Sequence, residues 1–176
     1  MIEFMKYDFY RQSTNHTFRS YLKNFFLSPG FNYVVWFRLA SKYKNGFMKY
    51  LLHRKMIQYG IEIYPETDIG KGFYIGHWGN IVINKHVKIG ENCNISQGVT
   101  IGIANGGKHP GVPTIGDRVY IGPGAKIFGN ITIGNDVAIG ANAVVINDIP
   151  HGVSVGGIPA KIISNTGSAN YIHNIS

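Results

Sequence analysis

The stretch IGDRVYIGPGAKIFGNITIGNDVAIGANAVV, residues 115–145, repeats one pattern of six residues. The aliphatic residues that open the successive units are Ile115, Ile121, Ile127, Ile133, Ile139 and Val145. A period of six fits neither a helix of 3.6 residues per turn nor an alternating hairpin strand. It is typical of a short strand followed by a turn, wound as a solenoid whose inward aliphatic side chains form one continuous core.

The same repeat extends toward the N-terminus, with two interruptions. Its upstream aliphatic positions are Ile63, Ile69, Ile75, Ile83, Ile89, Ile95 and Ile101. A slip of two residues precedes Ile83, and the insertion ANGGKHPGVPT occupies residues 104–114. We therefore expect a β-solenoid domain over residues 61–163, with roughly four to five coils and an inserted loop near 104–114.

Residues 1–60 follow a different pattern, in which apolar residues lie three and four apart and glycine ends each run. This pattern predicts short amphipathic helices within the stretches 15–26, 32–45 and 47–59. The C-terminal tail, residues 164–176, is polar, and we expect it to be loosely ordered.

The chain carries a formal net charge of +8, and all of that excess lies in residues 1–60. There the only acids are Glu3 and Asp8, and aromatic residues such as Trp36 stand between the cations. Two interpretations stay open: a basic cap on the end of the solenoid, or peripheral contact with the inner face of a membrane. No motif that reads nucleic acid accompanies the charge, so we expect no nucleic-acid partner.

Composition also bears on the compartment. A hydrophobic content of 44% with 15% charged residues indicates a folded globular protein. One cysteine, Cys93, excludes an internal disulfide and fits a reducing environment. We see neither an apolar run long enough to span a membrane nor a secretory signal, so we expect a cytoplasmic protein.

With the closing segment VGGIPAKII, residues 155–163, the repeats resemble those of the hexapeptide-repeat acyltransferases. The resemblance implies an all-β, left-handed parallel β-helix, acetyl-CoA as co-substrate, and a homotrimer with its sites between neighbouring solenoids. It places the pantetheine arm along low walls in the later coils, the phosphates at a basic residue, and oxyanion stabilisation at backbone N–H groups. The residues that it assigns to these coenzyme A contacts are Gly102, Gly122, Ala125, Gly140, Ala141 and Lys161.

The segment IEIYPETDIGKGFYIGHWGNIVI, residues 61–83, resembles the serine acetyltransferase branch of that class. The resemblance makes His77 the general base and Glu62, fifteen residues earlier, the carboxylate that orients it. An imidazole suits the removal of a hydroxyl proton near neutral pH. Lys108 and His109 resemble an Arg-His pair of that branch, which implies that His109 is an acceptor-site partner or a second base.

One departure from that branch concerns the acceptor. Gly76 stands where the branch has an acid that holds an amino acid, and Trp78 offers a flat face of the kind that stacks on sugar rings. We therefore expect direct transfer of acetyl to a sugar hydroxyl of a capsule or exopolysaccharide or its precursor, with Trp78, Lys108 and His109 holding this glycan. Serine O-acetylation for cysteine biosynthesis and a non-enzymatic β-helix scaffold stay open as alternatives.

Non-catalytic interpretations of His77 and His109 also stay open. His77 is then a surface residue at a corner of an imperfect repeat, and His109 a solvated loop residue. A related β-helix group binds zinc through three histidines, but this chain lacks the close histidine pair that such a site uses, so we expect no metal.

Overall fold

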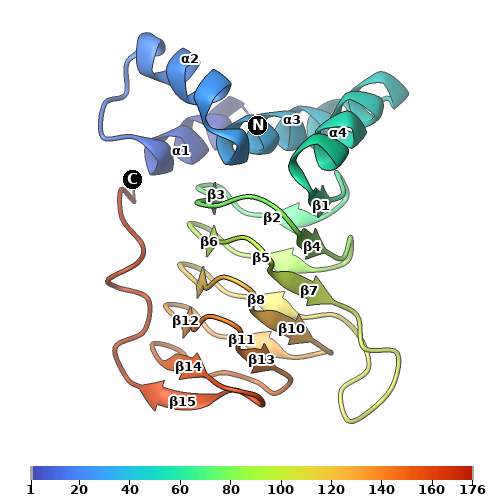
Figure 1. Ribbon diagram of the computed structural model, residues 1–176, viewed down its shortest axis with the longest axis vertical. Coiled ribbons are helices and arrows are strands. Elements are labelled where there is room, and N and C mark those ends of the chain that lie inside the picture. Colours follow the sequence, from blue (N-terminus) through green and yellow to red (C-terminus); the bar gives the residue numbers. More distant parts are fainter. Residues whose placement is uncertain (1, 176) are drawn as a thin grey trace.

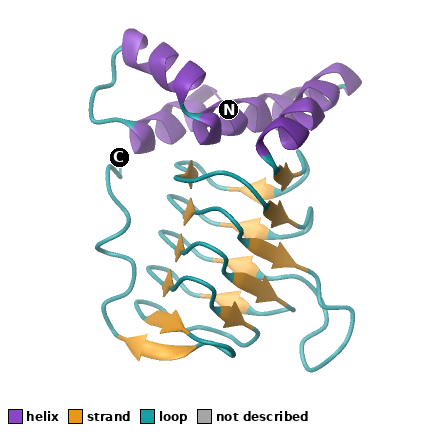
Figure 2. Ribbon diagram, in the orientation of Figure 1, coloured by secondary structure: helices purple, strands orange, loops and turns teal. Residues whose placement is uncertain are grey.

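The computed structural model describes residues 2–175, in which four helices form a layer across one end of a five-coil parallel β-helix (Figures 1 and 2). The helices are α1 (Ile2–Gln12), α2 (Phe18–Leu27), α3 (Pro29–Tyr43) and α4 (Gly46–Tyr59). Three of them overlap the stretches expected to be helical, whereas α1 was not recognised as a separate helix. The side chains of Thr17, Ser28 and Asn45 cap the N-termini of α2, α3 and α4.

Fifteen short strands follow in the described part of the chain. They are β1 (Ile61–Ile63), β2 (Asp68–Ile69), β3 (Tyr74–Ile75), β4 (Ile81–Ile83), β5 (Lys88–Ile89), β6 (Asn94–Ile95), β7 (Thr100–Gly102), β8 (Thr114–Ile115), β9 (Tyr120–Ile121), β10 (Lys126–Phe128), β11 (Thr132–Ile133), β12 (Ala138–Ile139), β13 (Val144–Val145), β14 (Ser154–Gly156) and β15 (Lys161–Ser164).

The strands form three parallel sheets, one along each side of a triangular prism. The first face has the order β1-β4-β7-β10-β13, and the second has β2-β5-β8-β11. The third face has β3-β6-β9-β12-β14, and β15 joins its end as an antiparallel strand. Each coil therefore passes through the first, second and third faces in turn.

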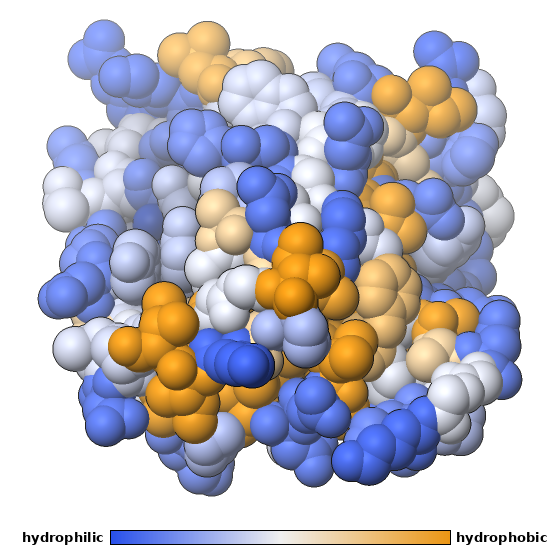
Figure 3. All heavy atoms as spheres, turned by 60° about the horizontal axis from the view of Figure 1, so that its bottom comes forward, coloured by the Kyte–Doolittle hydropathy of each residue, from blue (hydrophilic) through white to orange (hydrophobic). Residues whose placement is uncertain are grey.

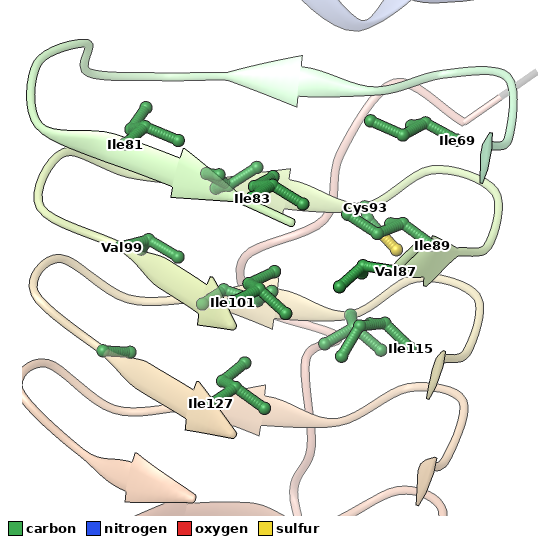
Figure 4. Close-up of a cluster of buried hydrophobic side chains, with 14 of the residues drawn as sticks. Ile69, Ile81, Ile83, Val87, Ile89, Cys93, Val99, Ile101, Ile115 and Ile127 are labelled. Carbon is green, nitrogen blue, oxygen red and sulfur yellow. The ribbon is translucent and has the colours of Figure 1, made fainter. Parts of the chain in front are cut away.

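The repeated aliphatic residues point into the prism. Along the first face, the residues that stack in register are Ile63, Ile83, Ile101, Ile127 and Val145. Figure 4 shows three of these side chains one above another, and none is more than 1% exposed. Burying each such side chain contributes about 1.5–3 kcal/mol, so the ladder supplies the continuous core that the repeat predicts.

Cys93 belongs to this core. It is fully buried, and burial raises the pKa of its thiol to about 12. Since the reactive form of cysteine is the thiolate, Cys93 is a packing residue and not a nucleophile.

The two interruptions of the repeat change the coil length at defined corners. Ile61 pairs with Ile81, twenty residues on, whereas Lys126 pairs with Val144, eighteen residues on. The two extra residues lie at the corner before β4, where Gly79 and Asn80 have φ values of +105° and +51°. This left-handed conformation is one that glycine and asparagine tolerate.

The longer insertion leaves the prism between β7 and β8, at the corner between the first and second faces (Figure 1). Its base is closed by an antiparallel bridge, in which Ala104 and Gly111 each donate a backbone hydrogen bond of 2.9 Å to the other. The loop is thus a defined projection from an otherwise regular coil.

A buried ion pair fastens the helical layer to the first coil. Arg38 of α3 donates to both carboxylate oxygens of Asp8 on α1, at 2.9 and 3.1 Å. It also donates to the backbone carbonyls of Ile69 and Gly70 at 2.6 and 2.5 Å, while Asp8 accepts the N–H of Phe73 at 2.9 Å. Burial raises the pKa of Asp8, and the ion pair with Arg38 opposes this rise.

The C-terminal tail differs from the loosely ordered segment that we expected. It runs back along the third face toward the helices (Figure 1). The ring of Tyr171 stacks on Tyr120 with centroids 4.2 Å apart, and Asn94 donates to the carbonyl of Tyr171 at 2.9 Å. Ser168 is buried and donates to the carbonyl of Arg118. Polar side chains on the outside of the third face thus supply partners that the tail's own composition does not reveal.

We predict that Asp8→Ala lowers the free energy of unfolding by about 3–5 kcal/mol, because it leaves the Arg38 charge buried without its partner. Urea unfolding followed by circular dichroism measures this loss. The matched control is Glu91→Ala, which breaks the partly exposed pair with Lys71 and is expected to cost about 1 kcal/mol or less. Equal losses in the two variants would contradict the anchoring role of Asp8.

Candidate active site

Glu62 stands on the outside of the first face. It lies between the inward side chains of Ile61 and Ile63 in β1, and side chains alternate along a strand. The hydroxyl of Tyr64 donates to its Oε1 at 2.9 Å, and this hydrogen bond raises the pKa of Tyr64. From the core side, the hydroxyl of Tyr33 donates to the carbonyl of Ile63 at 2.8 Å and accepts its N–H at 3.2 Å. The strand that carries Glu62 is therefore held from both sides.

A cavity of about 730 Å³ lies beside Glu62 on the first face. Its lining residues are Glu62, Tyr64, Glu66, Val82, Ile83, Asn84, Lys85, Ile101, Gly102, Ile103 and Phe128. A Cβ atom at Gly102 would collide with the ring of Phe128. The glycine thus lets this ring lie against the face, where it forms an apolar part of the cavity lining.

The rim of this cavity carries charges of both signs. Lys49 of α4 donates to Glu66 at 2.6 Å, and this hydrogen bond lowers the pKa of Glu66. Lys85 also lines the cavity and contributes a smaller lowering of the same pKa. Sequence analysis did not find Tyr64, Glu66 or Lys85. The available signal was the placement of Tyr64 two residues after Glu62, on the same side of the chain.

His77 lies at the corner between the third and first faces, in the turn that joins β3 to β4. Both His77 and Trp78 are exposed, the latter by 48%. Among residues 2–175, no hydrogen bond or ion pair engages the imidazole of His77, and none joins it to Glu62. The ring is therefore available to solvent or to a ligand.

Gly76 lies against the ring of Tyr74. A Cβ atom placed there would lie 3.1 Å from Cε1 of Tyr74, closer than an ordinary contact. A side chain at position 76 would therefore require the ring of Tyr74 to shift slightly.

His109 lies in the inserted loop, at the corner between the first and second faces. Its backbone carbonyl accepts the N–H of Asn130 at 2.9 Å, which fixes the loop against the fourth coil. A Cβ atom at Gly129, where φ is +97°, would lie 2.7 Å from this carbonyl. His109 is half-buried and Lys108 is exposed.

Two of the glycines assigned to coenzyme A share the corner of His77. Gly122 follows β9 and Gly140 follows β12, so both lie where the third face turns into the first. Gly122 donates to the carbonyl of Ile139 at 2.8 Å, which stacks the two turns in adjacent coils. With about 4.8 Å between coils, His77 lies roughly 14 Å along this edge from Gly140.

Three further assigned residues, Ala125, Ala141 and Lys161, lie in the later part of the β-helix or on β15. Ala141 is exposed next to Gly140, and Lys161 is exposed on β15, opposite Gly156. The methyl group of Ala125, in contrast, is fully buried in the core, so this residue can offer a ligand only its backbone. These assignments stay predictions.

One chain thus brings together some of the predicted residues and separates others. Glu62 and Gly102 line one cavity, and His77 shares an edge with Gly122 and Gly140. His77 and His109 lie at two different corners, with the first face between them. Within the described residues, no group of three His, Cys, Asp or Glu side chains converges on a point that could hold a metal ion.

Comparison with known proteins identifies similar chains. Residues 113–147 match the family model for bacterial transferase hexapeptide (six repeats). A serine acetyltransferase of Helicobacter pylori (strain J99 / ATCC 700824) is 41% identical over 144 residues, which cover 78% of this chain and 83% of that protein. A serine acetyltransferase of Bacillus subtilis (strain 168) is 37% identical over 155 residues, 85% of this chain and 70% of that one.

Solved structures give the same result. Serine acetyltransferase from Brucella abortus strain S19 in complex with coenzyme A superposes with a TM-score of 0.79 and 32% identity, covering 94% of this chain and 68% of that chain. Neisseria gonorrhoeae serine acetyltransferase in complex with serine superposes with a TM-score of 0.77 and 30% identity. This match covers 93% of this chain and 69% of that chain. These matches confirm the left-handed parallel β-helix that we expected.

The comparisons also correct our expected acceptor. The similar proteins are serine acetyltransferases, so the hypothesis of a sugar hydroxyl in a capsule or exopolysaccharide was wrong. It depended on Gly76 and Trp78. The absence of an acid at position 76 does not by itself exclude an amino acid as acceptor. Exposure of Trp78 at a corner does not by itself indicate a sugar.

Proposed function

Because the chain belongs to the serine acetyltransferase family, we propose that it transfers the acetyl group of acetyl-CoA to the hydroxyl of serine. The products are O-acetylserine and coenzyme A. The protein is an acetyl-CoA-dependent acyltransferase, and the proposal concerns its acceptor and its residues.

The charged rim of the 730 Å³ cavity is the observation that carries this acceptor. A free amino acid has an ammonium and a carboxylate a few ångströms apart. Glu66, which also accepts a hydrogen bond from Lys49, and Lys85 both line this cavity, so it presents charges of both signs to such a ligand. A neutral sugar has no charge to pair with either group.

In the proposed mechanism, His77 is the general base. Its imidazole removes the proton of the serine hydroxyl as the oxygen attacks the carbonyl carbon of the thioester. The resulting tetrahedral oxyanion is stabilised by backbone N–H groups near Gly102. The C–S bond then breaks, and the imidazolium returns its proton to the departing thiolate of coenzyme A.

The proposed role of Glu62 is to orient this imidazole. One carboxylate oxygen accepts the hydroxyl of Tyr64, and the other is left for the second ring nitrogen of His77. A carboxylate there fixes the tautomer and stabilises the imidazolium that forms. Tyr64 acts in turn as a positioning residue, because it holds the carboxylate on the side of the cavity.

We propose that the working enzyme is a homotrimer. His77 and His109 lie at different corners of one prism, so a neighbouring subunit is needed to bring the inserted loop of one chain to the His77 corner of another. Closed cyclic assemblies join two different surfaces in this head-to-tail way. His109 then approaches the acceptor as a partner of His77, with Lys108 beside it.

No helix among residues 2–175 is long and apolar enough to cross a membrane. We propose a cytoplasmic enzyme, as the single reduced cysteine suggests. Peripheral contact with a membrane stays a separate prediction that concerns the helical layer.

The direct test measures thiol release from acetyl-CoA with L-serine as acceptor. We expect turnover that falls about 10²–10⁴-fold in His77→Ala, because the variant lacks the group that takes the hydroxyl proton, while coenzyme A still binds. If the unaltered protein binds coenzyme A but does not acetylate serine, the proposal that serine is the acceptor is wrong. Full activity in His77→Ala would show that His77 is not the general base.

A second test concerns the amino-acid charges. Lys85→Met and Glu66→Gln are expected to raise KM for serine about tenfold, roughly the loss of one charge-assisted hydrogen bond, with KM for acetyl-CoA unchanged. The matched control is Lys88→Met, which removes an exposed lysine from β5 on the second face. An unchanged KM for serine in both cavity variants would exclude this rim as the amino-acid site.

A further inference from the structure

The outer surface of α2 combines apolar and basic side chains. None of the residues of α2 is buried. Its exposed large apolar side chains are Phe18 (75%), Leu22 (39%), Phe26 (75%) and Leu27 (71%). Arg19 and Lys23 are exposed among them, and α2 contains no acid. A surface helix ordinarily turns its apolar side chains toward the core. On this face of α2, large apolar side chains are exposed to solvent instead.

The opposite side of α2 already makes the contacts that the fold requires. The ring of Tyr21 meets Phe9 and Phe31 edge-on, with centroids 5.2 and 5.4 Å apart. Phe25 packs against the same small cluster, and Thr17 caps the helix by accepting the N–H of Ser20. The exposed apolar residues are thus not needed to hold α2 in place.

The charge around α2 is almost wholly positive. α2 lies at the outer end of the molecule, on the side of the helical layer away from the β-helix (Figure 1). Residues 1–60 hold the whole net charge of +8. Of their two acids, Asp8 is buried in its pair with Arg38, which leaves Glu3 alone to oppose the cations.

A groove of about 360 Å³ lies between α1 and α2, next to Phe18. It is lined by Met5, Lys6, Phe9, His16, Thr17, Phe18 and Tyr21. An apolar slot with a lysine at its side matches the chemistry of an acyl chain below a phosphate headgroup.

We propose that α2 docks this protein on a membrane surface rich in anionic phospholipids. Phe18, Leu22 and Phe26 enter the boundary between headgroups and acyl chains, and Arg19 and Lys23 meet the phosphates. Helices of this composition lie in the plane of the interface, and anionic lipids attract basic segments. The like charge of a second copy disfavours self-association through the same face. This inference is independent of the acceptor proposed above.

Flotation of the full-length protein with vesicles tests the proposal. We expect binding to phosphatidylcholine vesicles that contain about one third phosphatidylglycerol, weak binding to phosphatidylcholine alone, and release when salt rises from about 0.1 M to about 0.5 M. Phe18→Ser/Phe26→Ser is expected to lower the partition coefficient about tenfold or more. Arg19→Gln/Lys23→Gln should lower it about fivefold for each cation removed.

The matched control uses the other end of the molecule, where the surface is also apolar (Figure 3). Ile162→Ser/Ile163→Ser removes side chains that are 53% and 69% exposed on β15 and is expected to leave binding unchanged. Unfolding midpoints equal to that of the unaltered protein will show that all variants fold. Absence of binding to anionic vesicles would overturn the proposal, as would equal loss in this control. Self-association that Phe18→Ser/Phe26→Ser abolishes, without vesicle binding, would assign α2 to a second copy instead.

Discussion

The inward stacking of one aliphatic side chain every six residues is the constraint on which the rest of this structure depends. No coil of eighteen residues can bury its own apolar side chains, so each coil is stable only between two neighbours. At one end the helical layer covers the first coil in place of a neighbouring coil, and Tyr33 and Phe37 of α3 join the core. The ion pair between Asp8 and Arg38 fastens that layer to the first coil.

The same register that buries the isoleucines also aligns the corners of the prism. Turns one coil apart lie above one another, as the hydrogen bond from Gly122 to Ile139 shows. His77, Gly122 and Gly140 therefore share one edge, although they are far apart in sequence. The two interruptions of the repeat change this regular arrangement locally. Gly79 and Asn80 widen the corner of His77, and the inserted loop carries His109 away from the prism.

Much of the fold could be predicted from the sequence because its signal is local and repeated. The positions of the inward residues, the slip before Ile83 and the inserted loop all follow from counting in sixes. The order of the tail could not be predicted this way, because it depends on side chains such as Asn94 and Tyr120, which are distant in sequence. Gly76 was misinterpreted because one missing carboxylate was given more weight than the similarity of the whole chain to serine acetyltransferases.

The proposed site combines residues that one prism keeps apart, so subunit mixing tests its central claim most directly. His77→Ala and His109→Ala chains, each expected to be nearly inactive, would be unfolded together in equal amounts and refolded. If the site joins His77 of one subunit to His109 of its neighbour, random trimers should recover about one quarter of the activity of the unaltered enzyme. A mixture no more active than its parents, or full activity in His109→Ala alone, would contradict the account.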